Sequence, residues 1–214
     1  MSVLPRRVGL FGGSFNPPHV CHTLATCWAL QTGNLDEVWW LPTYQHAFGK
    51  DLVGFETRVA MCELALRDLD RVKICTIERE LGGESRTIDT VKALKARHPG
   101  DAYTLIVGAD ILAERHKWKN WEGLMELVSL KVIGRAGYEE AYQEWQEEGK
   151  SRVLRGEVDN EPAFHTHPFT LPVVSSTRIR QMLRVARQEA RAEFDGWLID
   201  AVIDFIEEQE LYTK

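Results

Sequence analysis

The sequence of 214 residues lacks the features that mark several specialised classes of protein. It has no apolar run near the roughly 20 residues that cross a bilayer, and its start has no secretory pattern of basic residues and a long apolar stretch. Basic residues are not in excess, because 26 Lys and Arg against 32 Asp and Glu give a net charge of -6. We therefore expect a cytoplasmic protein with no nucleic-acid or membrane partner, which must capture any anionic ligand locally.

Cysteine is scarce, and no internal repeat or low-complexity tract is present. The four cysteines, Cys21, Cys27, Cys62 and Cys75, show no paired spacing, so we expect reduced thiols. With 44% hydrophobic and 27% charged residues, the composition is ordinary for a globular protein and excludes a disordered tail or a fibrous repeat. Because domains average about 150 residues, we expect residues 1–214 to form a single domain.

Hydrophobic patterning predicts strands that alternate with helices. Strands are expected over residues 7–11, 38–41, 72–77, 103–107, 130–133 and 171–174. Helices are expected from residue 19, over 57–69, across 88–94, after 176 and across 197–205. Several strands are apolar enough to be covered on both faces, which favours an α/β fold with a parallel sheet. We expect a Rossmann-like, doubly wound sheet with C-terminal helices, and a helical and loop excursion over 139–168.

A glycine-rich loop follows the first expected strand and leads into a helix. The loop contains Gly12, Gly13, Ser14 and Phe15. Backbone N–H groups in such a loop, together with the helix dipole, favour a bound phosphate. His19 and His22 lie three residues apart on a helix face that differs from the apolar face of Val20 and Leu24. Histidines in this place can donate hydrogen bonds to phosphate and stabilise charge that develops on phosphorus.

Two distant runs together resemble a known superfamily. GGSFNPPHVCH, residues 12–22, resembles the signature of the nucleotidyltransferases with a His-x-Gly-His motif, although Cys21 replaces the glycine. VSSTRIR, residues 174–180, resembles their second signature. There, Ser176 and Thr177 can cap a helix and bind phosphate, and Arg180 can reach a polyphosphate tail. The resemblance implies that both runs bind ATP and that His19, His22 and Arg180 are catalytic.

Further stretches extend the resemblance over nearly the whole chain, to the bacterial nicotinate-mononucleotide adenylyltransferase family. Residues 87–90, TIDT, are similar to the family's segment at the mononucleotide site, with Arg86 where an aromatic residue is frequent. LIVGAD at 105–110, the tryptophans 118 and 121, and VIGRAGY at 132–138 follow the family's order and spacing. The resemblance implies that the mononucleotide is bound by Thr87, Asp89, Trp118 and Arg135.

The residues themselves allow more than one role in this block. Trp118 can stack on a pyridine ring, although tryptophan is most often simply packed. Arg135, at the end of a strand, can meet a phosphate or a carboxylate, or can be an exposed cation. Gly108 and Asp110 close another strand, where ligands bind in open α/β sheets. Asp110 can hold ribose hydroxyls, orient the nucleotide or cap a helix.

Other histidines and one lysine complete the candidate residues. Lys50 lies near the place of the family's basic phosphate-binding residue, although the neighbouring prolines are missing. We expect Lys50 to bind ATP phosphates, and His46 is a weaker candidate for the same role. His165 and His167 have no further ligand at a convincing spacing, so we predict no metal site there.

The resemblance implies transfer of AMP from ATP to nicotinate mononucleotide, with Mg²⁺ bound to ATP, and it leaves a homo-oligomer open. An already ionised phosphate needs no strong base, so positioning and charge stabilisation can suffice. Alternatives are an adenylyltransferase for nicotinamide mononucleotide or phosphopantetheine, and a nucleotide sensor without catalysis. A zinc-binding module built on His19, Cys21, His22 and Cys27 is a further alternative.

Overall fold

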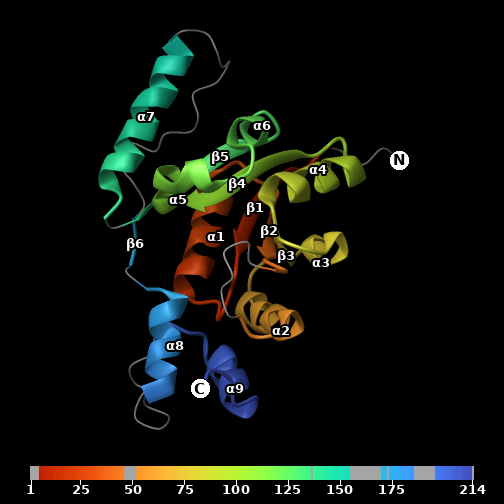
Figure 1. Cartoon of the computed structure of the whole chain (residues 1–214), viewed down its shortest axis with the longest axis vertical. Coiled ribbons are helices and arrows are strands. Elements are labelled where there is room, and N and C mark those ends of the chain that lie inside the picture. Colours follow the sequence, from red (N-terminus) through yellow and green to blue (C-terminus); the bar gives the residue numbers. More distant parts are fainter. Residues whose placement is uncertain are drawn as a thin grey trace.

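The computed structural model describes residues 5–45, 52–135, 137–154, 170–172, 174–185 and 196–213. Within them, six strands form one sheet in the order β3-β2-β1-β4-β5-β6 (Figure 1). The strands are β1 (Arg7–Gly13), β2 (Glu37–Pro42), β3 (Val72–Ile74), β4 (Ala102–Gly108), β5 (Ser129–Arg135) and β6 (Thr170–Leu171). Every neighbouring pair in this sheet is parallel. The order reverses between β1 and β4, as in the Rossmann fold, so the expected fold class is confirmed.

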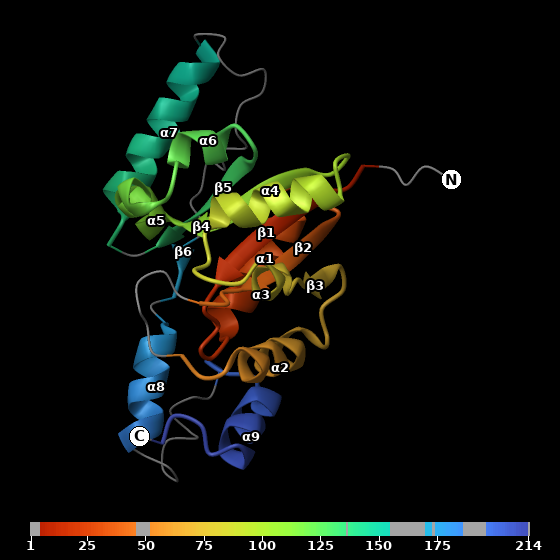
Figure 2. The same ribbon diagram turned by 45° about the vertical axis from the view of Figure 1, so that its right-hand side comes forward.

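Helices cover both faces of the sheet. They are α1 (Val20–Thr32), α2 (Phe55–Leu66), α3 (Ile77–Leu81), α4 (Thr87–Arg97), α5 (Ala109–Glu114), the 3-10 helix η1 (Arg115–Lys117), α6 (Trp121–Met125), α7 (Glu139–Leu154), α8 (Ser176–Val185) and α9 (Asp200–Glu208). Figure 1 shows α1 on one side of β1 and β2, and α3 and α4 on the other. Two views place α7 at one end of the molecule and α8 and α9 at the other (Figures 1 and 2). None of the helices in the described ranges has the length and apolar character of a membrane span.

The alternation of side chains along β2 explains the two layers. Val38 and Trp40 belong to a buried cluster with α1, α2, α8 and α9, whereas Trp39 and Leu41 belong to a second cluster with α3 to α7. Successive residues of a strand point to opposite faces of the sheet, so a continuous apolar run is buried only when both faces are covered. The run from Val38 to Leu41 is buried throughout, as the doubly wound arrangement requires.

Two strand predictions were wrong at their ends. A strand was expected over 72–77, but β3 ends at Ile74 and Ile77 begins α3. Its partner β2 ends at Pro42, which has no N–H to extend the ladder. A strand was also expected over 171–174, but β6 ends at Leu171. Pro172 follows directly and again cannot donate a backbone hydrogen bond.

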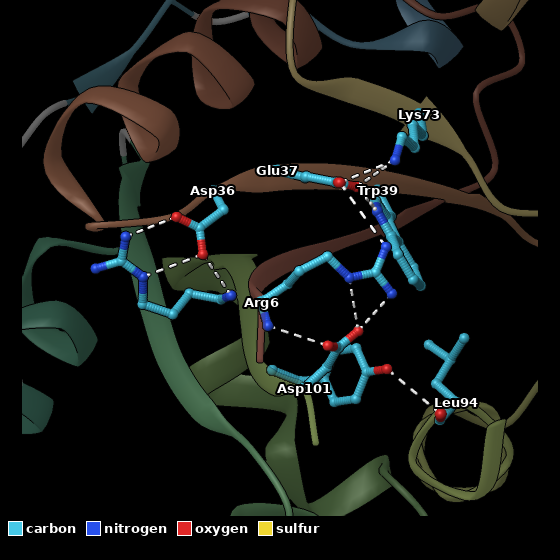
Figure 3. Close-up of polar contacts among 9 residues, drawn as sticks. Arg6, Asp36, Glu37, Trp39, Lys73, Leu94 and Asp101 are labelled. Carbon is cyan, nitrogen blue, oxygen red and sulfur yellow. Dashed lines mark hydrogen bonds and ion pairs between the residues drawn. The ribbon is translucent and has the colours of Figure 1, made fainter. Parts of the chain in front are cut away.

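A polar network ties together the amino ends of the strands, opposite the candidate site (Figure 3). The Arg6 guanidinium donates to Asp101 through Nε and Nη2, at 3.0 and 2.6 Å, and its backbone N–H donates to the other carboxylate oxygen at 3.0 Å. Arg6 also lies over the ring of Trp39, whose Nε1 donates to Glu37. These contacts fix the start of β1 against β2 and β4.

Candidate active site

The candidate site is a pocket of about 550 Å³ where the carboxyl ends of β1, β4 and β5 meet the first turns of α1, α4 and α8. Ligands of open α/β sheets bind at this edge, beside the point where the strand order reverses. Most of the residues predicted from sequence line the pocket: Gly12, Gly13, Ser14, Phe15, His19, His22, Thr87, Gly108, Asp110, Trp118, Arg135, Ser176, Thr177 and Arg180. The fold thus brings together segments that are up to 168 residues apart in the chain.

The loop after β1 is held by a buried arginine that the sequence analysis missed. Arg58 of α2 donates through Nη1 to the carbonyl oxygen of Ser14 at 2.9 Å and through Nη2 to that of Thr43 at 2.7 Å. Its Nε donates to the carbonyl of Val53 at 3.0 Å. Only 1% of Arg58 is exposed, so these carbonyls compensate the burial of its charge. The loop therefore keeps one conformation in which its N–H groups can face the pocket.

Phe15 anchors the same loop through its ring. It has a φ of 45°, in the left-handed region, and its buried ring stacks on Trp40 with a centroid distance of 4.4 Å. A Cβ atom on Gly13 would come within 3.1 Å of the Phe15 ring, so a larger residue there would require the ring to shift by a few tenths of an ångström. The glycine-rich run is therefore shaped by core packing as well as by its exposure to ligand.

The second signature closes the loop from the other side. Arg180 of α8 donates through Nη1 to the carbonyl of Asn16 at 2.7 Å, and Ser176 Oγ donates to the carbonyl of Pro17 at 2.8 Å. Tyr212, beyond α9, donates to Oδ1 of the buried Asn16 at 2.7 Å. The two distant signatures thus form one rigid wall, and Arg180 Nη2 also lies 3.4 Å from Thr177 Oγ1.

The two histidines lie side by side at the start of α1. The backbone N–H of His19 donates to Nδ1 of His22 at 3.0 Å, and the ring centroids are 3.8 Å apart. Because Nδ1 accepts, the proton of neutral His22 lies on Nε2. Burial, and next the charge of Arg135, lower the pKa of His19 to about 4. Burial also lowers the pKa of His22 well below its usual value, as do His19 and Arg135. Both rings are therefore neutral near pH 7 in the free protein.

Cys21, which replaces a glycine of the superfamily motif, packs rather than binds metal. Its side chain is buried on the pocket wall, and its Sγ lies 3.6 Å from the carbonyl oxygen of Pro172. In the described ranges, no group of three or more His, Cys, Asp or Glu side chains could hold a metal ion, and this includes the set with His19, His22 and Cys27. Among these residues the structure therefore gives no support to the zinc-module alternative.

Asp110 and Arg135 face each other across the ends of β4 and β5. Arg135 Nη1 donates to Asp110 Oδ2 at 2.6 Å. Asp110 Oδ1 is buried and has no hydrogen-bond partner among the residues that the structure describes, and a Cβ atom on Gly108 would clash with it. The glycine thus leaves room for the carboxylate.

The start of α4 forms the opposite wall of the pocket, where Arg86 and Thr87 lie with Trp118. Glu78, which the sequence analysis did not select, organises this wall. Its carboxylate accepts from the backbone N–H of Tyr44 at 3.1 Å and from Thr90 Oγ1 at 3.3 Å. Burial raises the pKa of Glu78, and its hydrogen bonds oppose that rise. Its sequence context, a charged run Glu78-Arg79-Glu80 between Ile77 and Leu81, gives no sign that Glu78 is the buried member.

Among the predicted residues that the structure describes, Asp89 does not line the pocket. The carboxylate of Asp89 points to Lys119 and accepts a hydrogen bond from Nζ at 2.9 Å, while Lys119 itself lines the pocket. Lys50 and His46 lie outside the described residues, as do His165 and His167.

Comparisons with known proteins agree on one type of enzyme. The model of the cytidylyltransferase-like family matches residues 10–182. The chain is 41% identical over 210 residues to a protein of Anaeromyxobacter dehalogenans (strain 2CP-C) named "probable nicotinate-nucleotide adenylyltransferase", with 97% of each chain covered. A protein of the same name from Myxococcus xanthus is 38% identical over 208 residues, covering 96% of this chain and 94% of that one.

A solved structure has the same fold. Nicotinic acid mononucleotide adenylyltransferase of Plasmodium falciparum, complexed with NaAD, matches with a TM-score of 0.72 and 18% identity. The match covers 97% of both chains. At this identity the similarity establishes the fold alone, and the relatives of higher identity carry the argument about family.

Proposed function

The chain belongs to the cytidylyltransferase-like family and, within it, to the nicotinate-nucleotide adenylyltransferases, and on this premise we propose how it acts. It is a nucleotidyltransferase of NAD biosynthesis that transfers AMP from ATP to nicotinate mononucleotide. The products are nicotinate adenine dinucleotide and pyrophosphate. The observation that carries the proposal is the single wall formed by the β1–α1 loop, the two histidines and Arg180.

In the reaction, a phosphate oxygen of nicotinate mononucleotide attacks the α-phosphorus of ATP. A new P–O bond forms, and the bond from the α-phosphorus to the oxygen that bridges it to the β-phosphorus breaks. Pyrophosphate leaves with the electron pair. The attacking phosphate is already ionised near neutral pH, so the chain need not supply a strong base. Its contribution is to position both substrates and to stabilise charge on the α-phosphate.

His19 and His22 would act at the α-phosphate as hydrogen-bond donors. Since His22 Nδ1 is occupied by the backbone N–H of His19, its Nε2–H is the group free to meet a phosphate oxygen. A neutral imidazole can donate this bond without becoming the nucleophile. The lowered pKa of each histidine supports this role, because the rings enter the reaction uncharged.

Arg180 and Thr177 would hold the β- and γ-phosphates, with Ser176, the loop residues 12–15 and Lys50 as further ATP contacts. Nη1 of Arg180 donates to the carbonyl of Asn16, and this hydrogen bond fixes the direction in which its remaining donors point. Gly108 and Asp110 would contact the nucleotide, since both line the pocket at the carboxyl end of β4. Thr87, Trp118 and Arg135 would bind the mononucleotide, and Asp89 would act through Lys119, which it pairs with at the pocket wall.

A divalent metal ion, in our proposal Mg²⁺, would enter with ATP. In the described ranges there is no cage of three or more metal-ligating side chains, which fits an ion bound mainly by phosphate oxygens and water. Asp110 is a carboxylate of the pocket wall, beside which such a water could lie. The ion would neutralise charge on the leaving pyrophosphate.

Three further statements stay predictions. We expect residues 1–214 to work as one nucleotidyltransferase domain in the cytoplasm, either alone or as a homo-oligomer. Neither the amide mononucleotide nor phosphopantetheine is the preferred acceptor in this proposal.

The test is pyrophosphate release from ATP and Mg²⁺, with nicotinate mononucleotide, nicotinamide mononucleotide and phosphopantetheine offered in parallel. We expect the nicotinate form to give the highest kcat/KM. Release with none of the three, from protein that circular dichroism shows to be folded, would contradict the proposed function and favour the nucleotide sensor.

A further inference from the structure

Basic side chains line the pocket in two separate groups. In the described ranges, Arg135 and Arg180 lie with the histidines: Arg135 lowers the pKa of both, and Arg180 binds the loop before them. Arg86 instead directly precedes α4, Lys117 ends η1, and Lys119 lies in the short segment between η1 and α6. The pocket can therefore receive negative charge at two places.

In the second group, Lys117 and Lys119 flank Trp118 in the chain. Lys119 donates to Asp89 in the first turn of α4 at 2.9 Å, and this ion pair joins α4 to the segment that carries Trp118. Trp118 is itself partly buried and meets the ring of Trp121 edge to face, with centroids 5.7 Å apart. An aromatic ligand that stacks on Trp118 would thus share the pocket with Arg86, Lys117 and Lys119.

We propose that the guanidinium of Arg86 binds the carboxylate on the pyridine ring of nicotinate mononucleotide and so makes the enzyme prefer the acid to the amide. This inference rests on the proposed function. The acceptor carries negative charge at two separate positions, its phosphate and its ring carboxylate, and the two basic groups of the pocket match them. The amide has no charge at the second position.

Arg86 is better suited to this contact than the two lysines. Its side chain is 34% exposed, against 46% for Lys117 and 56% for Lys119, so its charge is screened less by water. A guanidinium also offers paired donors that match both oxygens of a carboxylate, which an ammonium group does not. The same donors face a primary amide poorly, because the amide nitrogen carries hydrogens of its own.

The surroundings of Arg86 support the role. Glu84 pairs with Nη2 of Arg86 and restrains the side chain, leaving other guanidinium donors for a ligand. Arg86 also directly precedes Thr87, the first residue of the eleven-residue α4. The helix dipole places partial positive charge at this end, which adds to the attraction for a carboxylate.

The test compares kcat/KM for the nicotinate and nicotinamide mononucleotides in the wild type, Arg86→Met, Arg86→Lys and Arg97→Met. Arg97 is the matched control, because it lies at the other end of α4, pairs with Glu80 and does not line the pocket. We expect Arg86→Met to lower kcat/KM for the nicotinate form by about 10- to 100-fold, the usual cost of losing a hydrogen bond to a charged group. The loss should appear in KM, since the carboxylate is remote from the reacting phosphorus.

In Arg86→Met, kcat/KM for the nicotinamide form should stay within about twofold of the wild-type value, a change far smaller than the loss of a charged contact would cause. Retained activity with the amide also shows that the variant is folded. Arg86→Lys should keep part of the preference, and Arg97→Met all of it. The inference would be overturned if Arg86→Met left the ratio of kcat/KM for the two acceptors unchanged, including the case in which both values fall equally. A wild type that is inactive with both acceptors would instead refute the proposed function.

Discussion

The backbone N–H of His19 donates to Nδ1 of His22 at 3.0 Å, so one histidine fixes the ring of the other. This bond leaves the proton of neutral His22 on Nε2, the nitrogen available to a ligand. It also places both rings within one helical turn, with centroids 3.8 Å apart beside the glycine-rich loop.

His22→Ala should lower kcat by about 100- to 1,000-fold, the usual effect of removing one preorganised donor from a charge-stabilising site. The measurement is steady-state pyrophosphate release, with circular dichroism to check the fold. His98→Ala is the control, because His98 lies beside Trp39 at the other edge of the sheet. Near-normal turnover in His22→Ala would remove the histidine pair from the mechanism.

Stability should fall with acid through His19. Its pKa is about 4 in the folded protein and about 6.5 when unfolded, so between these values the unfolded chain binds the additional proton. The contribution is complete above pH 6.5 and is lost as the pH falls towards 4, by about 3 kcal/mol at most. Urea denaturation between pH 7.5 and 4.5 measures this slope. His19→Gln should have a shallower slope than the wild type, and parallel curves would count against a buried neutral imidazole.

Arg180→Met should raise KM for ATP by about 10- to 100-fold, because it removes charged donors both from the loop and from the expected phosphates. Arg178→Met is the control on the same helix, since Arg178 lies 5.1 Å from the ring centroid of Trp197 and does not line the pocket. Kinetics at varied ATP concentration distinguish the two. Equal effects in both variants would argue for a general requirement for α8 rather than a phosphate contact.

Asp101→Ala should reduce the free energy of unfolding by about 1–2 kcal/mol, because it removes the carboxylate that accepts three hydrogen bonds from Arg6 and leaves Arg6 with the more distant Glu37, at 3.8 Å. Asp68→Ala should change it by less than about 0.5 kcal/mol, since the Arg67–Asp68 pair is exposed. Chemical denaturation measures both. Activity should stay unchanged in each, because the Arg6–Asp101 contact lies at the amino edge of the sheet. Equal stability changes would contradict the role given to this network.

The sequence predicted the parts of the fold that depend on local pattern. The apolar runs around Val38 and Leu105 are long enough to identify covered strands, and the loop at Gly12 has the composition of a strand-to-helix turn. Strand ends were less predictable, because they depend on the partner strand: β3 stops where β2 reaches Pro42. Short helices such as α3, with five residues, are stabilised by tertiary packing and leave little periodic signal.

The residues of the candidate site also fall into those that the sequence could predict and those that it could not. His19, His22 and Arg180 stand in recognisable runs, and the structure brings all three to one pocket. Arg58 and Glu78 could not be selected from sequence, since an arginine or glutamate on a helix is usually solvated. Their burial results from long-range contacts, such as the bond from Arg58 to the carbonyl of Ser14 across 44 residues.

The most direct test of the account follows the α-phosphorus of ATP. Wild-type protein is incubated with Mg²⁺, nicotinate mononucleotide and ATP labelled at that atom, and the products are separated by chromatography. The account predicts that the label moves into nicotinate adenine dinucleotide while one unlabelled pyrophosphate is released for each dinucleotide formed. Label that stays in ATP, or that appears as free AMP with the acceptor unchanged, would contradict AMP transfer as the function of this pocket.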